Sequence, residues 1–455
     1  MTHLTRRDFL KNGALASGAV LTGSLFESSP VYGAIDPDGK PAILGGEGVS
    51  YNAGPSWPVL NGDELERLDA VLKSRNWCRS GNPACVTNDF EAAYAEMCGA
   101  KHCIAVNSGT SALIASLSAF EIGPGDEVIT SPYTFIATVN CIIDHYALPV
   151  FADVDLNSFQ ICPQATEKLI TPNTRVLLPV HIGGAPAQMD AFLDVASRHG
   201  NLPIVEDACQ AHLGKWRGKY LGTLGSTGCF SMQVTKNLSC GDGGAILTND
   251  DRLADRLYKI HSNSRAPVTN SMDFQYDPLH ASNMRMTGFQ AALLLSQLPS
   301  ALERVKIRNE NALYLASLLR EIPGVYPQEI YDGGESAWHL FMSRIVEEEF
   351  GCSRDRVSEA MAAEGVNVSF GYSTGDWINY IRSIYSTSAA RRVYSEKDLD
   401  DWAERIQLPN LEKVCAQGLW ILQTQLLAPR ENMEVIADCM RRIQKHSAEI
   451  AQLET

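Results

Sequence analysis

A single lysine stands between two apolar runs, beside glycines that allow the backbone to come close to a ligand. The segment reads CFSMQVTKNLSCGDGGAILTND, from Cys229 to Asp250, and the lysine is Lys236. A lysine in such a place can act as a nucleophile and hold a carbonyl cofactor as a Schiff base. The simpler interpretation is a strand, a surface lysine, a turn and a second strand.

The motif NSGTSAL, Asn107 to Leu113, follows a strand-like run and precedes a helical one. Backbone N–H groups at a helix N-terminus favour an anion, so Gly109, Thr110 and Ser111 could hold a phosphate. Ser and Thr are also the usual N-cap residues of helices. The motif alone leaves these two interpretations about equal.

Two further motifs place polar or aromatic residues at predicted strand ends. In IVEDACQAH, Asp207 could cap a helix, bind a metal or pair with a protonated ring nitrogen, and Gln210 would face the same side if a helix began there. In SPYTFIAT, Phe135 could stack on a planar ring. Taken alone, a helix N-cap and core packing are the better interpretations of these two motifs.

The combination of these motifs is more specific than any one of them. It provides an anion site, an aromatic surface, a strand-end carboxylate and a lysine, all at the ends of strands in one predicted sheet. A phosphate-bearing aromatic aldehyde with a protonatable ring nitrogen needs those partners. The set therefore indicates pyridoxal 5'-phosphate as the cofactor.

The elements that position these residues follow a regular alternation. From Gly99 onward, short strand-like runs alternate with helical ones, which predicts a mostly parallel sheet covered by helices on both faces. Ligands of such sheets bind at the carboxyl ends of the strands. A long helical run follows Asn283, and the rest is mixed. We expect a large α/β domain with its N-terminal arm at 35–300 and a smaller α/β domain at 301–455.

Composition excludes several classes of protein. The chain has 455 residues and a net charge of −15, which argues against a nucleic acid or an anionic membrane as a partner. Its 12 cysteines show no metal-type spacing, and Cys141, Cys209 and Cys229 lie in apolar runs typical of a core. No G-x-G-x-x-G opens a helix after the first strand, which disfavours a nicotinamide enzyme.

Residues 1–34 have a different character. Arg6 and Arg7 precede Phe9, Leu10 and Lys11, and a short Gly/Ala-rich apolar stretch follows. This combination is typical of a twin-arginine export signal and is too short for a membrane span. The alternative is a basic amphipathic helix. We expect a protein exported to the periplasm, or a cytoplasmic one if the signal is not used.

The whole set of motifs resembles the DegT/StrS family of fold-type I pyridoxal phosphate-dependent sugar aminotransferases. Besides the motifs above, GPGDEVITSPYTFIAT, PVHIGGAPAQMDA and NMRMTGFQAALLLSQL fit the family in order and spacing. The segments GPSWPVLNG and FSMQVTKNL are similar to the branch that acts on cyclitol ketones and to aminohydroxybenzoate synthases, in which Gln often stands at the position of Gln233.

The resemblance implies a role for each site residue. Lys236 would form the Schiff base and move the proton, Asp207 would pair with the ring nitrogen, and Phe135 would stack on the ring. Asn283 would reach the phosphate of a neighbouring subunit, which implies a homodimer with shared sites. The remaining positions assigned to the cofactor are Gly109, Thr110, Ser111, Ser231 and Gln210. The implied reaction moves an amino group from Glu or Gln to a keto-sugar or a cyclitol ketone.

The chain departs from the family on the substrate side. Leu213 replaces a common glycine, and the segment NVSFGYSTGDWINYIRSIYS lacks the usual His/Pro-rich loop. Trp377, Tyr380 and Arg382 are candidate substrate residues there, with surface packing an equal alternative. Two alternative functions stay open: a non-catalytic binding or regulatory protein of the same fold, and a sugar dehydratase, which usually has His in place of the lysine.

Overall fold

The computed structural model describes residues 35–79, 84–265, 280–373, 376–388 and 390–453. Its centre is formed by two sheets that lie edge to edge, with strand orders β1-β9-β8-β5 and β3-β2-β4. Parallel bridges from Leu177 to Ile204 and from Val180 to Asp207 join them. The strands are β1 (His102–Val106), β2 (Glu127–Thr130), β3 (Leu148–Phe151), β4 (Thr174–Leu178), β5 (Val205–Asp207), β8 (Thr227–Ser231) and β9 (Gly244–Thr248).

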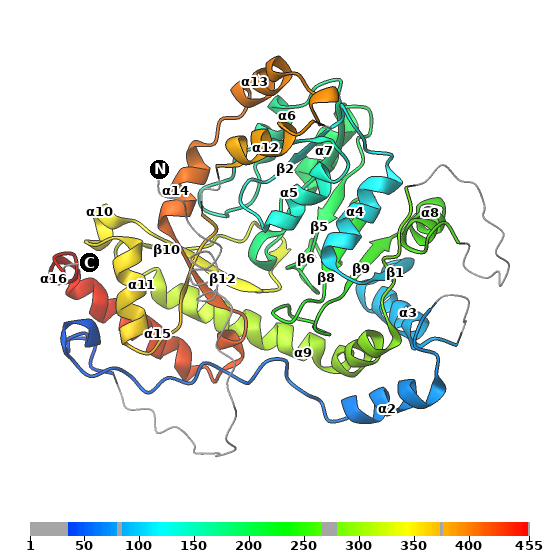
Figure 1. Ribbon diagram of the computed structural model, residues 1–455. Coiled ribbons are helices and arrows are strands. Elements are labelled where there is room, and N and C mark those ends of the chain that lie inside the picture. Colours follow the sequence, from blue (N-terminus) through cyan, green and yellow to red (C-terminus); the bar gives the residue numbers. More distant parts are fainter. Residues whose placement is uncertain (1–34, 80–83, 266–279, 374–375, 389, 454–455) are drawn as a thin grey trace.

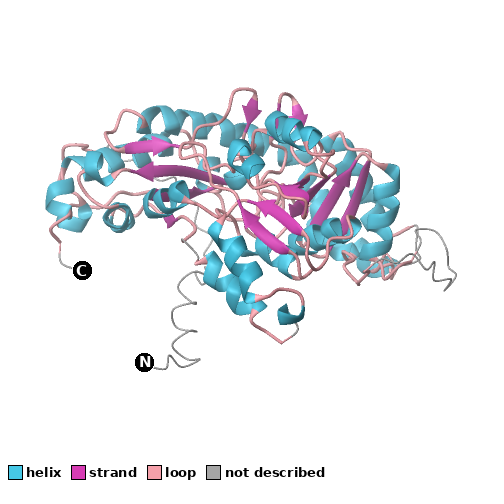
Figure 2. Ribbon diagram, turned by 90° about the horizontal axis from the view of Figure 1, so that it is seen from above, coloured by secondary structure: helices cyan, strands magenta, loops and turns pink. Residues whose placement is uncertain are grey.

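These strands form because short runs of Val, Ile, Leu, Ala and Phe are buried from both sides. The side chains of β2, β3 and β9 are buried along the whole strand, as expected for strands covered on both faces. Figure 2 shows helices along both sides of the strands. The mostly parallel α/β sheet is therefore confirmed, with β9 running antiparallel to both of its neighbours.

Helices follow the strands in the predicted order (Figure 1). In the unit that carries NSGTSAL, β1 leads to a helix whose N-cap is Ser108, and the Ser108 side chain accepts the N–H of Ser111. Packing of this helix against β8 and β9 fixes its N-terminus at the carboxyl edge of the sheet. The helices of this part are α2 (Glu64–Ser74), α3 (Val86–Cys98), α4 (Gly109–Ala119), α5 (Ile136–Ile143), α6 (Pro163–Lys168), α7 (Met189–Arg198) and α8 (Asp251–His261).

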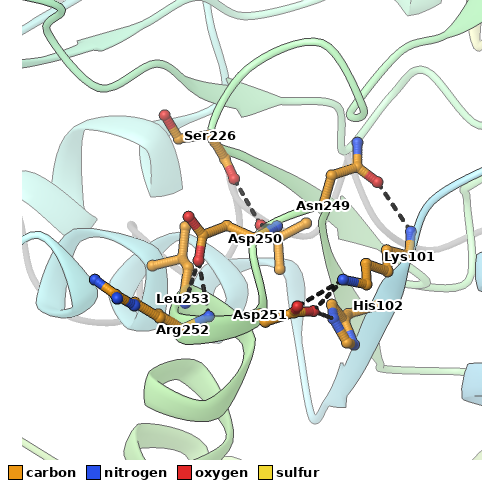
Figure 3. Close-up of polar contacts among 9 residues, drawn as sticks. Lys101, His102, Ser226, Asn249, Asp250, Asp251, Arg252 and Leu253 are labelled. Atoms are coloured by element: carbon orange, nitrogen blue, oxygen red, sulfur yellow. Dashed lines mark hydrogen bonds and ion pairs between the residues drawn. The ribbon is translucent and has the colours of Figure 1, made fainter.

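The junction between β9 and α8 is held by local polar contacts (Figure 3). Asp250 caps α8 and accepts the N–H groups of Arg252 and Leu253 at 2.8 and 2.9 Å. Lys101, next to β1, donates its N–H to the Asn249 side chain at 2.9 Å. A carboxylate cap at the positive end of the helix ends the strand and begins the helix within two residues.

One long helix, α9 (Gly288–Leu319), connects two apolar clusters and crosses the lower part of Figure 1. Thr287 and Gln290 form a capping box at its start. Its first half packs with the large sheet and its second half with a small sheet of order β10-β12-β14-β13. The remaining elements are β6 (Lys215–Trp216), β7 (Lys219–Tyr220), β10 (Val325–Pro327), β11 (Gly334–Glu335), β12 (Leu340–Ile345), β13 (Ser369–Phe370), β14 (Gly418–Leu422), α10 (Glu347–Phe350), α11 (Arg354–Ala363), α14 (Pro409–Gln417), α15 (Glu431–Lys445) and α16 (Ser447–Ile450).

Between β13 and β14 the chain leaves the small sheet and lies on the large one. Figure 1 shows α12 (Trp377–Tyr385) and α13 (Glu396–Glu404) in orange in the upper part of the molecule, and Tyr380 of α12 donates its hydroxyl to Asn140 of α5. Buried Trp377 and Trp402 donate their indole N–H groups to the backbone of Pro132 and Pro149 at 2.9 Å. These residues belong to the apolar cluster of the large sheet. The predicted domain boundary at 300/301 stays a prediction.

The N-terminal arm runs along the molecule before α2 begins. Ile35, Ile43 and Tyr51 pack against the small-sheet cluster, and Trp57 donates its indole N–H to Val234 O at 2.8 Å. The predicted export signal, residues 1–34, lies outside the described residues. In the described part of the chain, no helix combines the length and the hydrophobicity that crossing a membrane requires.

Candidate active site

A pocket of about 630 Å³ opens at the carboxyl ends of the large-sheet strands, which is the expected place for a ligand. Segments from the large central sheet and from the small sheet line it. Of the predicted site residues, the pocket is lined by Gly109, Thr110, Phe135, Asp207, Gln210, Ser231 and Lys236. The fold thus brings together the motifs that the sequence places at strand ends.

Lys236 lies in the loop between β8 and β9 and points its amine into this pocket. Its Nζ lies 3.4 Å from Nε2 of His339, which stands directly before β12. Burial lowers the pKa of the lysine, while nearby Cys209 and Asp207 raise it and so oppose part of that effect. A half-buried lysine with a lowered pKa has more of the neutral amine that a nucleophile needs. A plain surface lysine is therefore excluded.

Asp207 is the last residue of β5 and is 4% exposed. Its Oδ2 accepts the hydroxyl of Thr138 at 2.7 Å, and its Oδ1 accepts the N–H of Cys209 at 3.2 Å. A turn follows it instead of a helix, so the helix N-cap interpretation is wrong. A buried carboxylate without an ion pair among the described contacts is suited to hold a positively charged ring nitrogen.

The N-terminus of α4 forms one wall of the pocket. A Cβ added at Gly109 would lie 2.6 Å from Ser231 Cβ and 3.0 Å from Cys209 Sγ, so the glycine is required by this close approach. Ser111 does not line the pocket, because Ser108 Oγ accepts its N–H at 3.0 Å and its hydroxyl donates to Asn107. The N-cap interpretation of NSGTSAL is confirmed, and the same helix end also lines the pocket.

Phe135 and Gln210 occupy different parts of the same wall. The Phe135 side chain is 57% exposed, which contradicts core packing and leaves its ring free to stack on a ligand. Gln210 Oε1 accepts the N–H of Gly183 at 2.8 Å, and its Nε2 donates to the Tyr372 hydroxyl at 3.0 Å. These two bonds fix the amide, and one Nε2 hydrogen remains for the pocket.

The sequence did not reveal several residues of the pocket. Thr138 lies one helical turn into α5 and supports Asp207, whereas His339, Tyr372 and Trp420 come from the small-sheet segments. No pattern in the mixed region after the long helix indicates which side chains would face the large sheet. For Thr138 the signal was present, because it lies three residues after Phe135 at helical spacing.

Besides Ser111, four residues named from the sequence do not line the pocket. Asn283 is exposed and pairs its backbone with Ser262, so it does not complete the pocket of its own subunit. Trp377 is buried against Phe151, Tyr380 donates to the Asn140 side chain, and Arg382 pairs with Asp400. The last three hold α12 in place, so packing is the correct interpretation for them. Of the three core cysteines, Cys141 and Cys229 are buried, and Cys209 lines the pocket.

The residues present fit pyridoxal 5'-phosphate. The glycine cradle and free helix end at Gly109 and Thr110 suit a phosphate, Lys236 suits an aldehyde, and Asp207 suits a ring nitrogen. Among the described residues, no group of His, Cys, Asp and Glu is placed to hold a metal ion.

Comparison with known proteins decides the family. Residues 58–438 match the DegT/DnrJ/EryC1/StrS aminotransferase family. The chain belongs to this family. It is therefore a pyridoxal phosphate-dependent aminotransferase of the sugar and cyclitol type, as the motifs implied. The family is one of aminotransferases, which disfavours the non-catalytic and dehydratase alternatives.

Similar members of the DegT/DnrJ/EryC1/StrS family carry related names. The spore coat polysaccharide biosynthesis protein SpsC of Bacillus subtilis is 36% identical over 77% of this chain and 95% of its own. An L-glutamine:2-deoxy-scyllo-inosose aminotransferase of Streptoalloteichus tenebrarius is 32% identical over 90% of this chain and 98% of its own. The structure of 3-amino-5-hydroxybenzoic acid synthase is 29% identical, with a TM-score of 0.75 over 86% of this chain and 98% of that chain.

Proposed function

We propose that this aminotransferase takes the amino group of L-glutamine and transfers it to an uncharged cyclitol or sugar ketone. The pocket built around Lys236 and Asp207 carries this proposal. Relatives that match nine-tenths of the chain are named for L-glutamine and 2-deoxy-scyllo-inosose, a cyclitol ketone. The family match, residues 58–438, includes every segment that lines the pocket.

The charges of the pocket support an uncharged acceptor. Among the described residues that line it, Lys236 is the sole Lys or Arg, and Asp207 and Asp242 contribute carboxylates. A diphosphate-linked sugar carries negative charges that proteins usually meet with Arg or Lys. The hydroxyl groups of a cyclitol need hydrogen-bond partners, and Ser369, Tyr372 and Gln233 line the same pocket.

The residues divide the work of the reaction between them. Bound pyridoxal phosphate supplies an electron sink for bond changes at the amino-bearing carbon. We assign to Lys236 the binding of its aldehyde, and then the transfer of the proton at that carbon. Asp207, held by Thr138 and the Cys209 N–H, keeps a positive charge on the ring nitrogen. Gly109, Thr110 and Ser231 hold the phosphate.

An absorbance experiment tests the proposal. Purified protein loaded with pyridoxal phosphate is expected to show a visible band, which L-glutamine converts to a near-ultraviolet band. The Lys236→Ala variant is expected to lose the visible band and at least about 10²-fold in transamination rate. A wild-type protein whose visible band does not respond to L-glutamine would contradict the assignment of the donor.

The acceptor is tested on protein that already carries the amino group. Addition of 2-deoxy-scyllo-inosose is expected to restore the visible band, and a nucleotide diphosphate 4-keto-sugar serves as the comparison. The second acceptor deserves this test because a structure of DesI, described with its TDP-sugar product, matches with a TM-score of 0.74 at 26% identity. Restoration by the nucleotide sugar alone would overturn the uncharged acceptor.

Two further proposals concern the whole protein. We propose a homodimer in which Asn283 serves the site of the other subunit, supported by its exposure outside its own pocket.

We also propose export by the twin-arginine route, supported by the Arg6-Arg7 motif. Replacing both arginines with lysine is expected to keep a secreted fusion inside the cell, and unchanged secretion would contradict the export proposal.

A further inference from the structure

A group of buried basic side chains lies behind Lys236, and the roles above do not use it. The group consists of His339 before β12, His212 in the turn after β5, and Arg308 on α9. Their exposed fractions are 6%, 1% and 1%. Three basic side chains from three separate elements thus meet next to the amine of one lysine.

The contact between Lys236 and His339 suits a neutral imidazole that accepts a hydrogen bond. The lysine Nζ lies 3.4 Å from His339 Nε2. The amine has N–H groups to donate whether it is charged or neutral, and a neutral imidazole accepts through the ring nitrogen that carries no proton. When Nε2 accepts, the single ring proton lies on Nδ1, which is buried and has no partner among the described residues.

The surroundings of His339 keep it neutral. Burial is the main cause that lowers its pKa well below the usual value, and the neighbouring basic groups of Lys236, His212 and Arg308 lower it further. His212 behaves alike, because burial, Lys236 and Arg308 lower its pKa to about 3. Gln423, from the segment after β14, is uncharged and binds Arg308. His212, Arg308 and Gln423, which lie on three different segments around His339, are thus basic or uncharged groups that do not favour an imidazolium.

Backbone contacts set the distance between the lysine loop and the histidine. Asn237, next to Lys236, donates its side-chain amide to Ala337 O at 2.7 Å. A Cβ added at Gly184 would lie 3.0 Å from His339 N, so the main chain passes close on the other side as well. Gln423 N donates to His339 O at 3.2 Å. The approach of His339 to the lysine is thus built into the fold.

We propose that His339 is the positioning residue for the free amine of Lys236. It accepts one N–H of the amine and holds it at the pocket wall whenever the amine is not joined to the cofactor. A lysine amine on four flexible carbons otherwise samples many directions, and a fixed direction makes its return to the cofactor faster. Because the acceptor carries no negative charge, it does not raise the pKa of the lysine as a carboxylate would. This inference rests on the proposed role of Lys236.

The test follows the recapture of the cofactor by the full-length protein. Protein freed of cofactor is mixed with pyridoxal phosphate, and the rise of the visible band gives the rate, while quenching of tryptophan fluorescence gives the affinity. His339→Leu removes the hydrogen-bond acceptor. His339→Asn keeps a polar side chain that is too short to reach the amine of Lys236, and His339→Gln keeps an acceptor at about the distance of Nε2. His145→Gln is the matched control, since His145 is buried on another element and bonds to Ser118 at 2.8 Å.

The expected result is slower formation of the visible band with little change in the affinity for pyridoxal phosphate. His339→Leu and His339→Asn should form the band about tenfold more slowly, with affinity within about threefold of wild type. His339→Gln and His145→Gln should match the wild-type rate, and kcat should fall in the slow variants without a matching change in KM. If His339→Leu does not fold, the difference in the rate of band formation between His339→Asn and His339→Gln tests the positioning role.

Two outcomes separate failure of this inference from failure of the proposed function. Band formation at the wild-type rate in His339→Leu, or in His339→Asn where the Leu variant does not fold, would overturn the positioning role. An unchanged visible band in Lys236→Ala would overturn the role of the lysine itself, and with it the premise of the inference.

Discussion

At the scale of single residues, Gly109 is a position where one added methyl group is expected to weaken cofactor binding. Gly109→Ala places a Cβ 2.6 Å from Ser231 Cβ, so the end of α4 has to move away from the pocket. We expect the affinity for pyridoxal phosphate to fall by roughly tenfold or more, because the N–H groups at the start of α4 would no longer point toward the phosphate. Titration of the protein with pyridoxal phosphate measures this.

Gly123 provides the matched control for that substitution. A Cβ at Gly123 would meet nothing within 4 Å, and its backbone does not need the left-handed conformation. Gly123→Ala should therefore leave cofactor affinity unchanged. Equal affinities for the two variants would show that the cradle at Gly109 does not hold the phosphate.

Thr138 is the hydroxyl that supports the carboxylate of Asp207. Thr138→Val keeps the shape and removes the 2.7 Å hydrogen bond. We expect kcat/KM to fall by about 10- to 100-fold, since a hydrogen bond to a charged group contributes about 1.5–3 kcal/mol. Thr166→Val is the control, because Thr166 is also buried but bonds to Cys162 O, away from the pocket. Steady-state kinetics give kcat/KM for both variants. Equal kcat/KM values would contradict the proposal that the Thr138 hydroxyl supports the carboxylate of Asp207.

The site residues differ in how far the sequence could predict them. Lys236, Asp207 and Phe135 stand at the ends of strands in a strongly alternating region, so their meeting at one edge follows from the topology of parallel sheets. His339 and Tyr372 arrive from segments more than 100 residues later, as the separation of Lys236 and His339 shows. Their position depends on how the small sheet packs, which no local pattern encodes.

At the scale of elements, the excursion between β13 and β14 depends on a few buried aromatic side chains. Trp402 is 1% exposed and donates to Pro149 O, so Trp402→Ala leaves both a cavity and an unpaired carbonyl. We expect a loss of about 3–5 kcal/mol in the free energy of unfolding. Denaturant unfolding measures this, provided that the excursion unfolds together with the large sheet.

Arg382 tests the opposite expectation within the same excursion. Its ion pair with Asp400 joins side chains that are 37% and 56% exposed. Arg382→Ala should change the unfolding free energy by less than about 1 kcal/mol, because exposed ion pairs contribute little. It should also leave kcat and KM unchanged, since the side chain does not line the pocket. A large rise in KM would restore Arg382 as a substrate residue.

The elements themselves were predictable where a pattern repeats and unpredictable where tertiary contacts decide. Alternating strands and helices between β1 and β5 follow from hydrophobic runs and capping residues such as Ser108. The antiparallel direction of β9 cannot be predicted in this way, because β9 is buried along its whole length like β2 and β3, which pair in parallel. The docking of α12 and α13 on the large sheet is fixed by Trp and Tyr contacts to distant backbone carbonyls.

At the scale of the whole molecule, the proposed homodimer makes a prediction that no single subunit can satisfy. Lys236→Ala removes the lysine from a subunit's own site, whereas Asn283→Ala removes a contact that the subunit gives to its partner. Each variant alone is expected to be impaired in both sites of its dimer. In a mixed dimer, one site keeps both Lys236 and Asn283, and the other site lacks both.

Mixing the two purified variants under conditions that allow subunit exchange should therefore restore activity. Random exchange makes half of the dimers mixed, and one complete site in each predicts a rate of roughly a quarter of the wild type. The measurement is the transamination rate before and after exchange, with size-exclusion chromatography to confirm dimers. Each variant carried through exchange alone is the control. A mixed dimer gains a complete site only if Asn283 of one subunit acts in the site of the other. Dimers that exchange subunits without any gain in rate would therefore show that Asn283 does not serve the partner's site.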